Sequence, residues 1–369
     1  MKVCADRKHR DGGSLSGNKE GNRFSWVLIL GLGMLLAAGL TGCAESGYFN
    51  YLPDMEVNKK IAALERMMEQ ESEEIRFALV NEITDTLLKY GDVYKEILFL
   101  TNYIEAHPMD AYNALYLYKV AEAYEELNAI PVCIHYYERI LNNYPDIKMN
   151  NNDIYYSTIQ KLLKYVTDKE KIIEYYKLLL SRFFDKSKAN IGSIYYYLAR
   201  AYEGLGEWDR AIQEYVKFLK NPATRIPEEP DAYNKTTEKV EFYYSDKSWT
   251  RNDLNGLVAE IRSALIRRDL VRIRNLKSET VFFTKYWNQE EFDKTRADFF
   301  NLSTFILSSD VDVERELDPS SNSQEAYLKT RGWSYLVSTW YFYFRRINFP
   351  ANPEFDGRWE WAGIYFGEK

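Results

Sequence analysis

The chain of 369 residues carries 48 Lys and Arg against 55 Asp and Glu, a formal net charge of −7. Residues 1–42 hold six basic and three acidic side chains, so residues 43–369 carry −7 − 3 = −10. This acidic balance excludes the basic footprint of a nucleic-acid-binding protein. Three cysteines and three histidines are too few for a disulfide framework or a histidine-based metal centre. We therefore expect no nucleic-acid partner, no metal and no cofactor.

The amino-terminal segment combines basic residues with a short apolar run. Residues 26–40 (WVLILGLGMLLAAGL) would span roughly 22 Å as a helix, which is short of the ~30 Å hydrocarbon core of a bilayer. The run ends in Leu40-Thr41-Gly42-Cys43. A basic start followed by a short apolar stretch is typical of a signal peptide, here residues 1–42.

The tetrapeptide that ends at Cys43 resembles the lipobox of bacterial lipoproteins. The resemblance implies cleavage before Cys43, a diacylglycerol in thioether linkage on its sulfur, and acylation of the new amino terminus. Several acyl chains hold a protein durably to a bilayer. Ala44 in place of aspartate implies, by the enterobacterial sorting rule, an outer-membrane location facing the periplasm. An uncleaved membrane anchor and a plain secretory signal, in which Cys43 is incidental, are the alternatives.

Internal repeats dominate the next part of the chain. Residues 153–180 recur in residues 193–220 after a shift of 40 positions, and both copies open with an Ile-Tyr-Tyr triplet. Each copy has two stretches with apolar residues three and four positions apart, which is the pattern of two amphipathic helices. Self-similarity at such a period predicts stacked helical units. Two upstream copies extend the prediction to four helix pairs over residues 73–222, preceded by a capping helix over residues 56–70 within a segment 43–72.

The copy at residues 193–222 (SIYYYLARAYEGLGEWDRAIQEYVKFLKNP) resembles a tetratricopeptide repeat. Ala199 and Ala211 are the small residues that let the paired helices approach, Gly206 suits the left-handed turn between them, and Pro222 ends the unit. The resemblance implies a mainly α fold with a solenoid of helical hairpins.

The copy at residues 115–145 follows the same scheme. Asn128 takes the place of the turn glycine, since asparagine is the next most tolerant of positive φ. Pro131 lies at the start of the second helix, where its missing N–H costs nothing. Cys133 takes the position of the small alanine, so we interpret it as a small buried hydrophobe rather than a reactive thiol.

The resemblance also implies a peptide-binding groove lined by the first helix of each pair. The position three before the small residue commonly points into that groove, and here it is Asn81, Tyr118, Tyr156 and Tyr196 in successive units. The predicted peptide-binding residues are Tyr118, Tyr156, Tyr196 and Arg200, since tyrosines give large contact areas at low entropic cost. The alternative is that the tyrosines pack between adjacent units.

A carboxylate clamp of the chaperone-binding type is not expected in this groove. Such a clamp needs Lys, Asn and Arg at set positions, and this chain offers Arg200 but Glu122 and Gln160.

The carboxyl-terminal third changes character. Prolines at 222, 227 and 230 predict a linker over residues 223–250. Residues 254–276 have the period of one helix, while residues 334–345 and 358–366 have the period of strands, with Asp356-Gly357 in the turn before the last strand. Strands after helices predict a separate α+β domain at residues 251–369. The element order is similar to that of the nuclear transport factor 2-like superfamily.

We expect no enzyme activity from this domain. Glu360, Asp312 and Glu314 are the candidate acids or bases, and lone carboxylates on edge strands are usually solvated. Four arginines end the predicted helix, and we expect them to complement its dipole and to solvate a face. They are Arg267, Arg268, Arg272 and Arg274.

These patterns predict a membrane-anchored scaffold whose repeats bind an envelope protein or peptide, with membrane lipid as a second partner through acylated Cys43. An anchor followed at once by repeats resembles the tetratricopeptide lipoprotein of the outer-membrane β-barrel assembly machine, although that protein lacks the extra carboxyl-terminal domain. A transporter-associated or small-ligand-binding lipoprotein is the alternative function.

Overall fold

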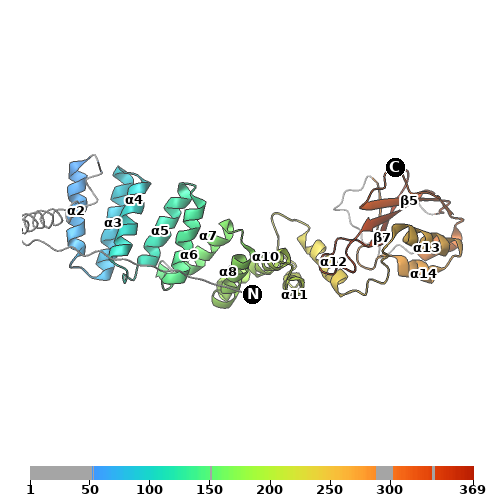
Figure 1. Cartoon of the computed structure of the whole chain (residues 1–369), viewed down its shortest axis with the longest axis horizontal. Helices are drawn as coiled ribbons and strands as arrows, with labels where there is room; N and C mark the ends of the chain where they lie inside the picture. Colours follow the sequence, from blue (N-terminus) through green and yellow to red (C-terminus); the bar gives the residue numbers. More distant parts are fainter. Residues whose placement is uncertain (1–51, 53, 150–151, 288–301, 335–336) are drawn as a thin grey trace, which may run out of the picture. The chain divides into compact units, whose positions relative to one another are not determined.

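The structure is a computed structural model that describes residues 52, 54–149, 152–287, 302–334 and 337–369. The signal segment and Cys43 lie outside the described residues, so the lipobox stays a prediction. The described chain forms two compact units, one ending at Ile147 and one spanning Lys148–Lys369 (Figure 1). This division falls within the range predicted for the repeats. Among the described helices, none has the length and apolarity needed to cross a bilayer.

The first unit consists of helices that pack as sequential neighbours. They are α2 (Met55–Met68), α3 (Glu73–Tyr90), α4 (Val93–Ala106), α5 (Asn113–Glu126) and α6 (Ile130–Asn143). The predicted helix over residues 56–70 corresponds to α2, which begins where the Asp54 carboxylate accepts the backbone N–H of Glu56 at 2.8 Å. Helices α3 with α4 and α5 with α6 form two of the four predicted pairs.

The second unit begins with the other two pairs. Its first elements are β1 (Lys148–Met149), β2 (Asn152–Asp153), α7 (Ile154–Tyr165), α8 (Lys169–Arg182), α9 (Phe184–Ser187), a 3-10 turn (Lys188–Asn190), α10 (Ile191–Gly204) and α11 (Trp208–Leu219). Helix α8 packs on both α7 and α10, and α10 packs on α11. Four helix pairs are therefore present over residues 73–222, as predicted.

The turns between α5 and α6 and between α10 and α11 have the left-handed residues that the sequence predicts. Asn128 has φ 54° and Gly206 has φ 75°. After each helix the left-handed residue donates its N–H to a carbonyl three residues earlier, and the next residue donates to one five residues earlier. These are the two bonds of a Schellman motif, which satisfies carbonyls that the ending helix leaves unpaired.

The segment predicted as a linker is structured, so that prediction is wrong. Helix α12 (Ala232–Tyr244) lies within residues 223–250 and packs against α11. Its Ala232, Thr236 and Val240 are buried and four residues apart, which places them on one face of a helix. The prolines lie in the turns that precede this helix.

The carboxyl-terminal domain places two helices on a mixed sheet. Helices α13 (Leu254–Ile266) and α14 (Leu270–Leu276) precede β3 (Phe283–Tyr286), α15 (Leu302–Ser308), β4 (Asp312–Val313), β5 (Glu325–Arg331), β6 (Trp340–Arg346) and β7 (Trp359–Phe366). The strand order is β3-β7-β6-β5-β4, with β3 parallel to β7 and the other pairs antiparallel. The last strand of the chain is therefore inside the sheet.

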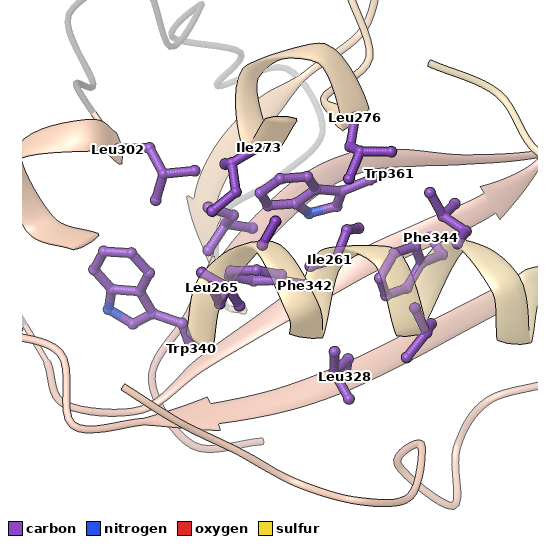
Figure 2. Close-up of a cluster of buried hydrophobic side chains, with 14 of the residues drawn as sticks. Ile261, Leu265, Ile273, Leu276, Leu302, Leu328, Trp340, Phe342, Phe344 and Trp361 are labelled. Carbon is purple, nitrogen blue, oxygen red and sulfur yellow. The ribbon is translucent and has the colours of Figure 1, made fainter. Parts of the chain in front are cut away.

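The core of this domain is aromatic. Figure 2 shows Ile261 and Leu265 of α13 over the rings of Phe342 and Trp361, which are stacked with centroids 4.5 Å apart. Trp340 lies further along the sheet and is completely buried. Burial of such large side chains is the main stabilising contribution to the domain.

Two sequence predictions for this domain need correction. The single helix over residues 254–276 is broken, because Arg268 has φ 53° and ends α13 in a third Schellman motif, after which the Asp269 carboxylate caps α14. The strand predicted from residue 334 begins only at Trp340. Gly357, with φ 78°, lies in the predicted turn before β7.

The environment of Glu360 also differs from the prediction of a solvated carboxylate on an edge strand. Its side chain is completely buried, where it accepts hydrogen bonds from Trp249 and Arg345. Asp312 is exposed, and Glu314 is partly exposed and pairs with Arg331 at 2.8 Å. Among the four arginines, Arg272 binds the carboxylate of Glu260 at 2.9 Å, so it has a specific partner in addition to its place near a helix end.

Candidate functional site

The predicted groove residues lie in different parts of the molecule. Tyr118 is half-buried on α5 of the first unit, with its ring edge-on to Tyr137 at 5.4 Å. Tyr156 is half-buried on α7 of the second unit and meets Phe183 edge-on at 5.6 Å. Tyr196 and Arg200 share α10. Within the second unit, Tyr196 and Arg200 lie one turn apart on the same helix.

Tyr196 is buried rather than exposed in a groove, which corrects the expectation for this residue. Its side chain is 4 % exposed, and its ring packs against Phe218 at 5.1 Å and Tyr215 at 6.0 Å. Both neighbours belong to α11, so the ring joins the two helices of its pair. These contacts lie within one helix pair, so they match neither groove exposure nor the alternative of packing between adjacent units. The Tyr196 hydroxyl has a different role.

A cavity of about 520 Å³ lies against α10, and we call it the α10 pocket. Its walls come from α8, from α10 and from the segment that leads into α12. Its lining includes Lys169, Tyr196, Tyr197, Arg200, Glu228, Glu229 and Lys235. The pocket therefore contains both predicted residues of α10.

One wall of the pocket is residues 225–231 (RIPEEPD), which we call the acidic loop. Ile226 anchors the loop, because its side chain is 3 % exposed within the core formed around α10 and α11. The backbone N–H of Glu229 donates to the carbonyl of Ile226 at 3.1 Å, and Pro227 follows Ile226, the position that proline favours in such a turn. This tight turn lets consecutive glutamates reach the α10 pocket.

Tyrosine hydroxyls of α10 hold the two glutamates. Tyr197 donates to Glu228 at 2.7 Å, and Tyr196 donates to Glu229. The ammonium of Lys235 donates to the other Glu229 oxygen at 3.1 Å, and Arg200 Nη1 lies 3.6 Å from the first. The two carboxylates of the acidic loop therefore accept charge-assisted hydrogen bonds from the tyrosine hydroxyls and from Lys235, with Arg200 close by.

The ionisation of these groups follows from their partners. Burial, with the Glu229 carboxylate in second place, raises the pKa of Tyr196 to about 12. The hydrogen bond from Tyr196 lowers the pKa of Glu229, and the bond from Tyr197 lowers the pKa of Glu228. At neutral pH the tyrosines are therefore donors and the glutamates are charged acceptors.

A second cavity of the same unit, about 350 Å³, is lined by residues of α10, α12, β6 and β7. Its carboxylates have partners within the protein. Lys239 binds both oxygens of Glu203 at 2.7 and 2.8 Å, and Glu360 accepts from Arg345 at 2.7 Å. The α10 pocket is larger and contains the predicted residues Tyr196 and Arg200, so it is the better candidate for binding.

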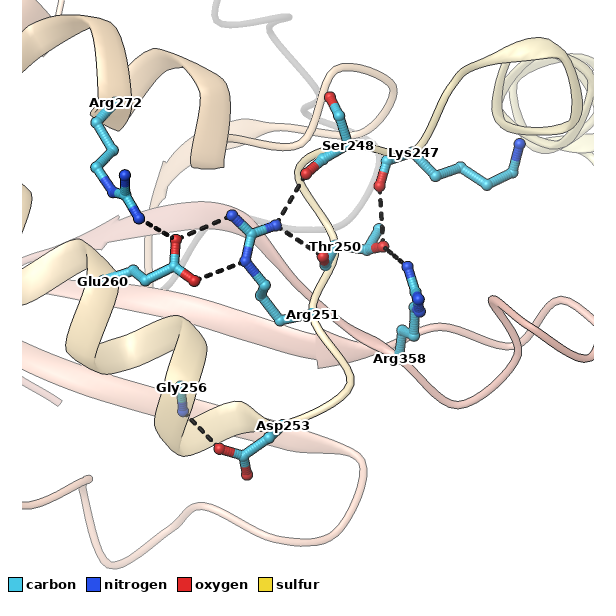
Figure 3. Close-up of polar contacts among 9 residues, drawn as sticks. All are labelled: Lys247, Ser248, Thr250, Arg251, Asp253, Gly256, Glu260, Arg272 and Arg358. Atoms are coloured by element: carbon cyan, nitrogen blue, oxygen red, sulfur yellow. Dashed lines mark hydrogen bonds and ion pairs between the residues drawn. The ribbon is translucent and has the colours of Figure 1, made fainter.

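Polar contacts at the start of the carboxyl-terminal domain also serve the fold. Figure 3 shows the Glu260 carboxylate between the guanidinium groups of Arg251 and Arg272. The Arg251 backbone pairs with that of Trp359 on β7. This arrangement fastens the chain before α13 to both helices and to the sheet. Among the described residues, no group of three or more histidines, cysteines or acidic side chains is placed to bind a metal.

The comparison with protein families agrees with the helix pairs. The family model of the tetratricopeptide repeat matches residues 116–146 and 194–223. The chain contains tetratricopeptide repeats. The matched stretches are the pairs α5 with α6 and α10 with α11, whose turns hold Asn128 and Gly206. No curated protein matches the chain.

Tetratricopeptide repeats are typically non-catalytic modules that bind proteins or peptides, and the α10 pocket lies on the first helix of a matched repeat. The sequence identified Tyr196 and Arg200 but missed the acidic loop that contacts them. Its only local signal was the pair Glu228-Glu229 between prolines 227 and 230, a composition equally typical of a linker.

Proposed function

We propose that this chain is a lipid-anchored scaffold of the bacterial cell envelope whose tetratricopeptide repeats bind a protein partner. The observation that carries the proposal is the α10 pocket, a cavity with aromatic and charged walls on the first helix of a matched repeat. The apolar run that ends at Cys43 supports the envelope location. The outer membrane facing the periplasm, with a part in outer-membrane protein assembly, is the specific setting that we propose.

Crosslinking in intact cells tests the scaffold. A photoreactive phenylalanine analogue would replace Tyr118, Tyr156 or Tyr197, which are all partly accessible side chains of first helices. Val271 of α14, which is 68 % exposed, is the control position outside the repeats. We expect the repeat positions to capture a common protein, and capture at Val271 alone would contradict a role for the repeats.

Mass spectrometry of the processed protein tests the anchor. We expect an amino-terminal Cys43 that carries a diacylglycerol and an amide-linked acyl chain, and we expect Cys43→Ala to leave the membrane fraction. An unmodified thiol at this position would contradict lipidation. For the assembly role, depletion of the protein should lower the amounts of β-barrel proteins in the outer membrane, and unchanged amounts would restrict the proposal to another envelope process.

The carboxyl-terminal domain belongs to the same proposal as a second docking surface of nuclear transport factor 2-like type. The helix pair α13 and α14, followed by a sheet that the last strand enters, supports this assignment. The paired carboxylates in the 350 Å³ cavity give no support to the small-ligand alternative.

A further inference from the structure

We propose that the α10 pocket recognises an acidic peptide of the partner, whose carboxylates replace those of Glu228 and Glu229. This inference rests on the proposed function and names the chemistry of the partner. The acidic loop is then a built-in competitor, which occupies the carboxylate positions until a partner segment takes them.

The donors of the pocket are arranged for carboxylates. The Tyr196 ring is fixed by its packing on Phe218 and Tyr215, so its hydroxyl is held in place before any ligand arrives. Lys169, Arg200 and Lys235 add three cations to the same walls. Preorganised donors bind a ligand with less loss of entropy than mobile ones.

The chemistry favours an acidic partner over a basic one. A cationic segment would have to draw Glu229 away from its donors, which would leave the buried Tyr196 hydroxyl without its acceptor. An unsatisfied buried donor carries the full desolvation penalty of the group. A carboxylate from a partner instead replaces one acceptor with another, and every donor keeps its bond.

The exchange requires only side-chain movement. The side chains of Arg200 and Lys235 are 55 % and 57 % exposed, and exposed ion pairs are individually weak. Ile226 can keep its buried position while Glu228 and Glu229 turn toward solvent. Because the loop is tethered at both ends, its carboxylates have an effective concentration on the order of millimolar, and a partner peptide must overcome this competition.

A labelled peptide with the sequence of the loop itself, TRIPEEPDAY (residues 224–233), is the probe. The matched peptide TRIPQQPDAY has amides in place of the two carboxylates. Binding of each to the full-length protein in detergent would be measured by fluorescence anisotropy. The variant Glu228→Gln with Glu229→Gln removes the built-in competitor, and we expect it to bind the glutamate peptide about tenfold more tightly than the parent does. We expect neither protein to bind the glutamine peptide.

Further variants make the outcome decisive. In the double-glutamine background, Tyr197→Phe and Arg200→Ala should each weaken binding of the glutamate peptide several-fold, and Glu241→Gln, an exposed change on α12, should not. If the double variant does not fold, the exposed Glu228→Gln alone should give a smaller gain. Equal binding of both peptides, or no gain after loss of the loop carboxylates, overturns the inference. Capture of a partner at Tyr118 or Tyr156 without acidic-peptide binding would leave the scaffold standing and remove this inference alone.

Discussion

The indole N–H of Trp249 donates a 2.8 Å hydrogen bond to the Glu360 carboxylate, and both side chains are completely buried. Trp249 follows α12 and Glu360 lies on β7, so the bond joins the end of the repeat helices to the sheet inside the second unit. Arg345 satisfies the other carboxylate oxygen at 2.7 Å. A buried charge of this kind is tolerated because it is both paired and hydrogen-bonded.

Removal of this carboxylate should destabilise the second unit strongly. Glu360→Leu leaves the Trp249 N–H buried without an acceptor and Arg345 without its counter-charge, and we expect a loss of about 3 kcal/mol or more in the free energy of unfolding. Trp249→Phe removes the donor and also shrinks a completely buried side chain, and it should cost about 1–3 kcal/mol. Urea unfolding followed by tryptophan fluorescence measures this, because every tryptophan except Trp26 lies in residues 148–369.

The control for this comparison is Glu314→Gln. Its carboxylate is 40 % exposed in a surface pair with Arg331, and such pairs contribute about 0–1 kcal/mol. A Glu360→Leu variant as stable as Glu314→Gln would show that the buried network adds nothing to the unit.

Because of Glu96, we expect the stability of the first unit to depend on pH. Its side chain on α4 is buried, and burial, reinforced by Glu126, Asp85 and Glu122 and opposed by Lys119, raises its pKa to about 7 from 4.5. The folded state therefore binds the proton more tightly than the unfolded state. The stability that this gives is complete below pH 4.5 and is lost as the pH rises through 7.

Glu96→Gln should remove this dependence. We expect the free energy of unfolding of the variant to exceed that of the parent by up to roughly 3 kcal/mol at pH 8, and to equal it near pH 4.5. Unfolding followed by circular dichroism at both pH values measures the difference, with the exposed Glu105→Gln of the same helix as control. An equal effect of the two substitutions at pH 8 would contradict a raised pKa of Glu96.

The sequence predicts those features that depend on local patterns. The four helix pairs follow from apolar spacing, and the left-handed turns follow from Gly206 and Asn128, because few residues tolerate positive φ. Cys133 is completely buried at the position of the small residue, as predicted. Period-two alternation likewise locates β7 almost to the residue.

Features that depend on distant partners escaped prediction. The acidic loop is held by one buried side chain, Ile226, and by tyrosines about 30 residues earlier, so its own composition indicates only a linker. The environment of Glu360 depends on Trp249, which lies 111 residues earlier in the chain, and on Arg345 of the neighbouring strand, and no local pattern specifies these contacts. The break at Arg268 has no compositional signal, because arginine rarely adopts positive φ.

The two matched repeat turns allow a test of backbone strain without a change in packing. At Gly206 an added Cβ meets nothing within 4 Å, so any cost of Gly206→Ala comes from φ 75° alone. We expect a loss of about 1–2 kcal/mol. Asn128→Gly removes the strain of a side chain at φ 54°, so it should be neutral or stabilising by up to about 1 kcal/mol. If urea unfolding shows that both substitutions lower the free energy of unfolding, or that both raise it, this account is contradicted.

Glu260 should give the second unit the opposite pH dependence to that of Glu96. The hydrogen bonds from Arg251, with a smaller contribution from Arg272, lower the pKa of Glu260 from 4.5. The stability from this carboxylate is therefore present above pH 4.5 and is lost as the pH falls through the lowered folded pKa. Glu260→Gln should be less stable than the parent at pH 7, and the difference should shrink on acidification. If the difference in stability between the variant and the parent is constant from pH 7 to pH 3, the variant has lost packing contacts and not the stability from the ionised carboxylate.

Gly192 determines how closely the chain before the acidic loop approaches α10. A Cβ at this position would lie 2.0 Å from Thr224 Oγ1 and 3.0 Å from the Asn221 Cβ. Gly192→Ala should therefore push residues 221–224 away and cost about 1–3 kcal/mol, despite the better helix propensity of alanine. Gly204→Ala is the matched control, because its Cβ would meet only the flexible Lys169 side chain, at 3.3 Å, and the change should stabilise α10 by up to about 1 kcal/mol. Tryptophan-detected urea unfolding distinguishes the two, and a Gly192→Ala variant as stable as Gly204→Ala would show that residues 221–224 are not tightly packed on α10.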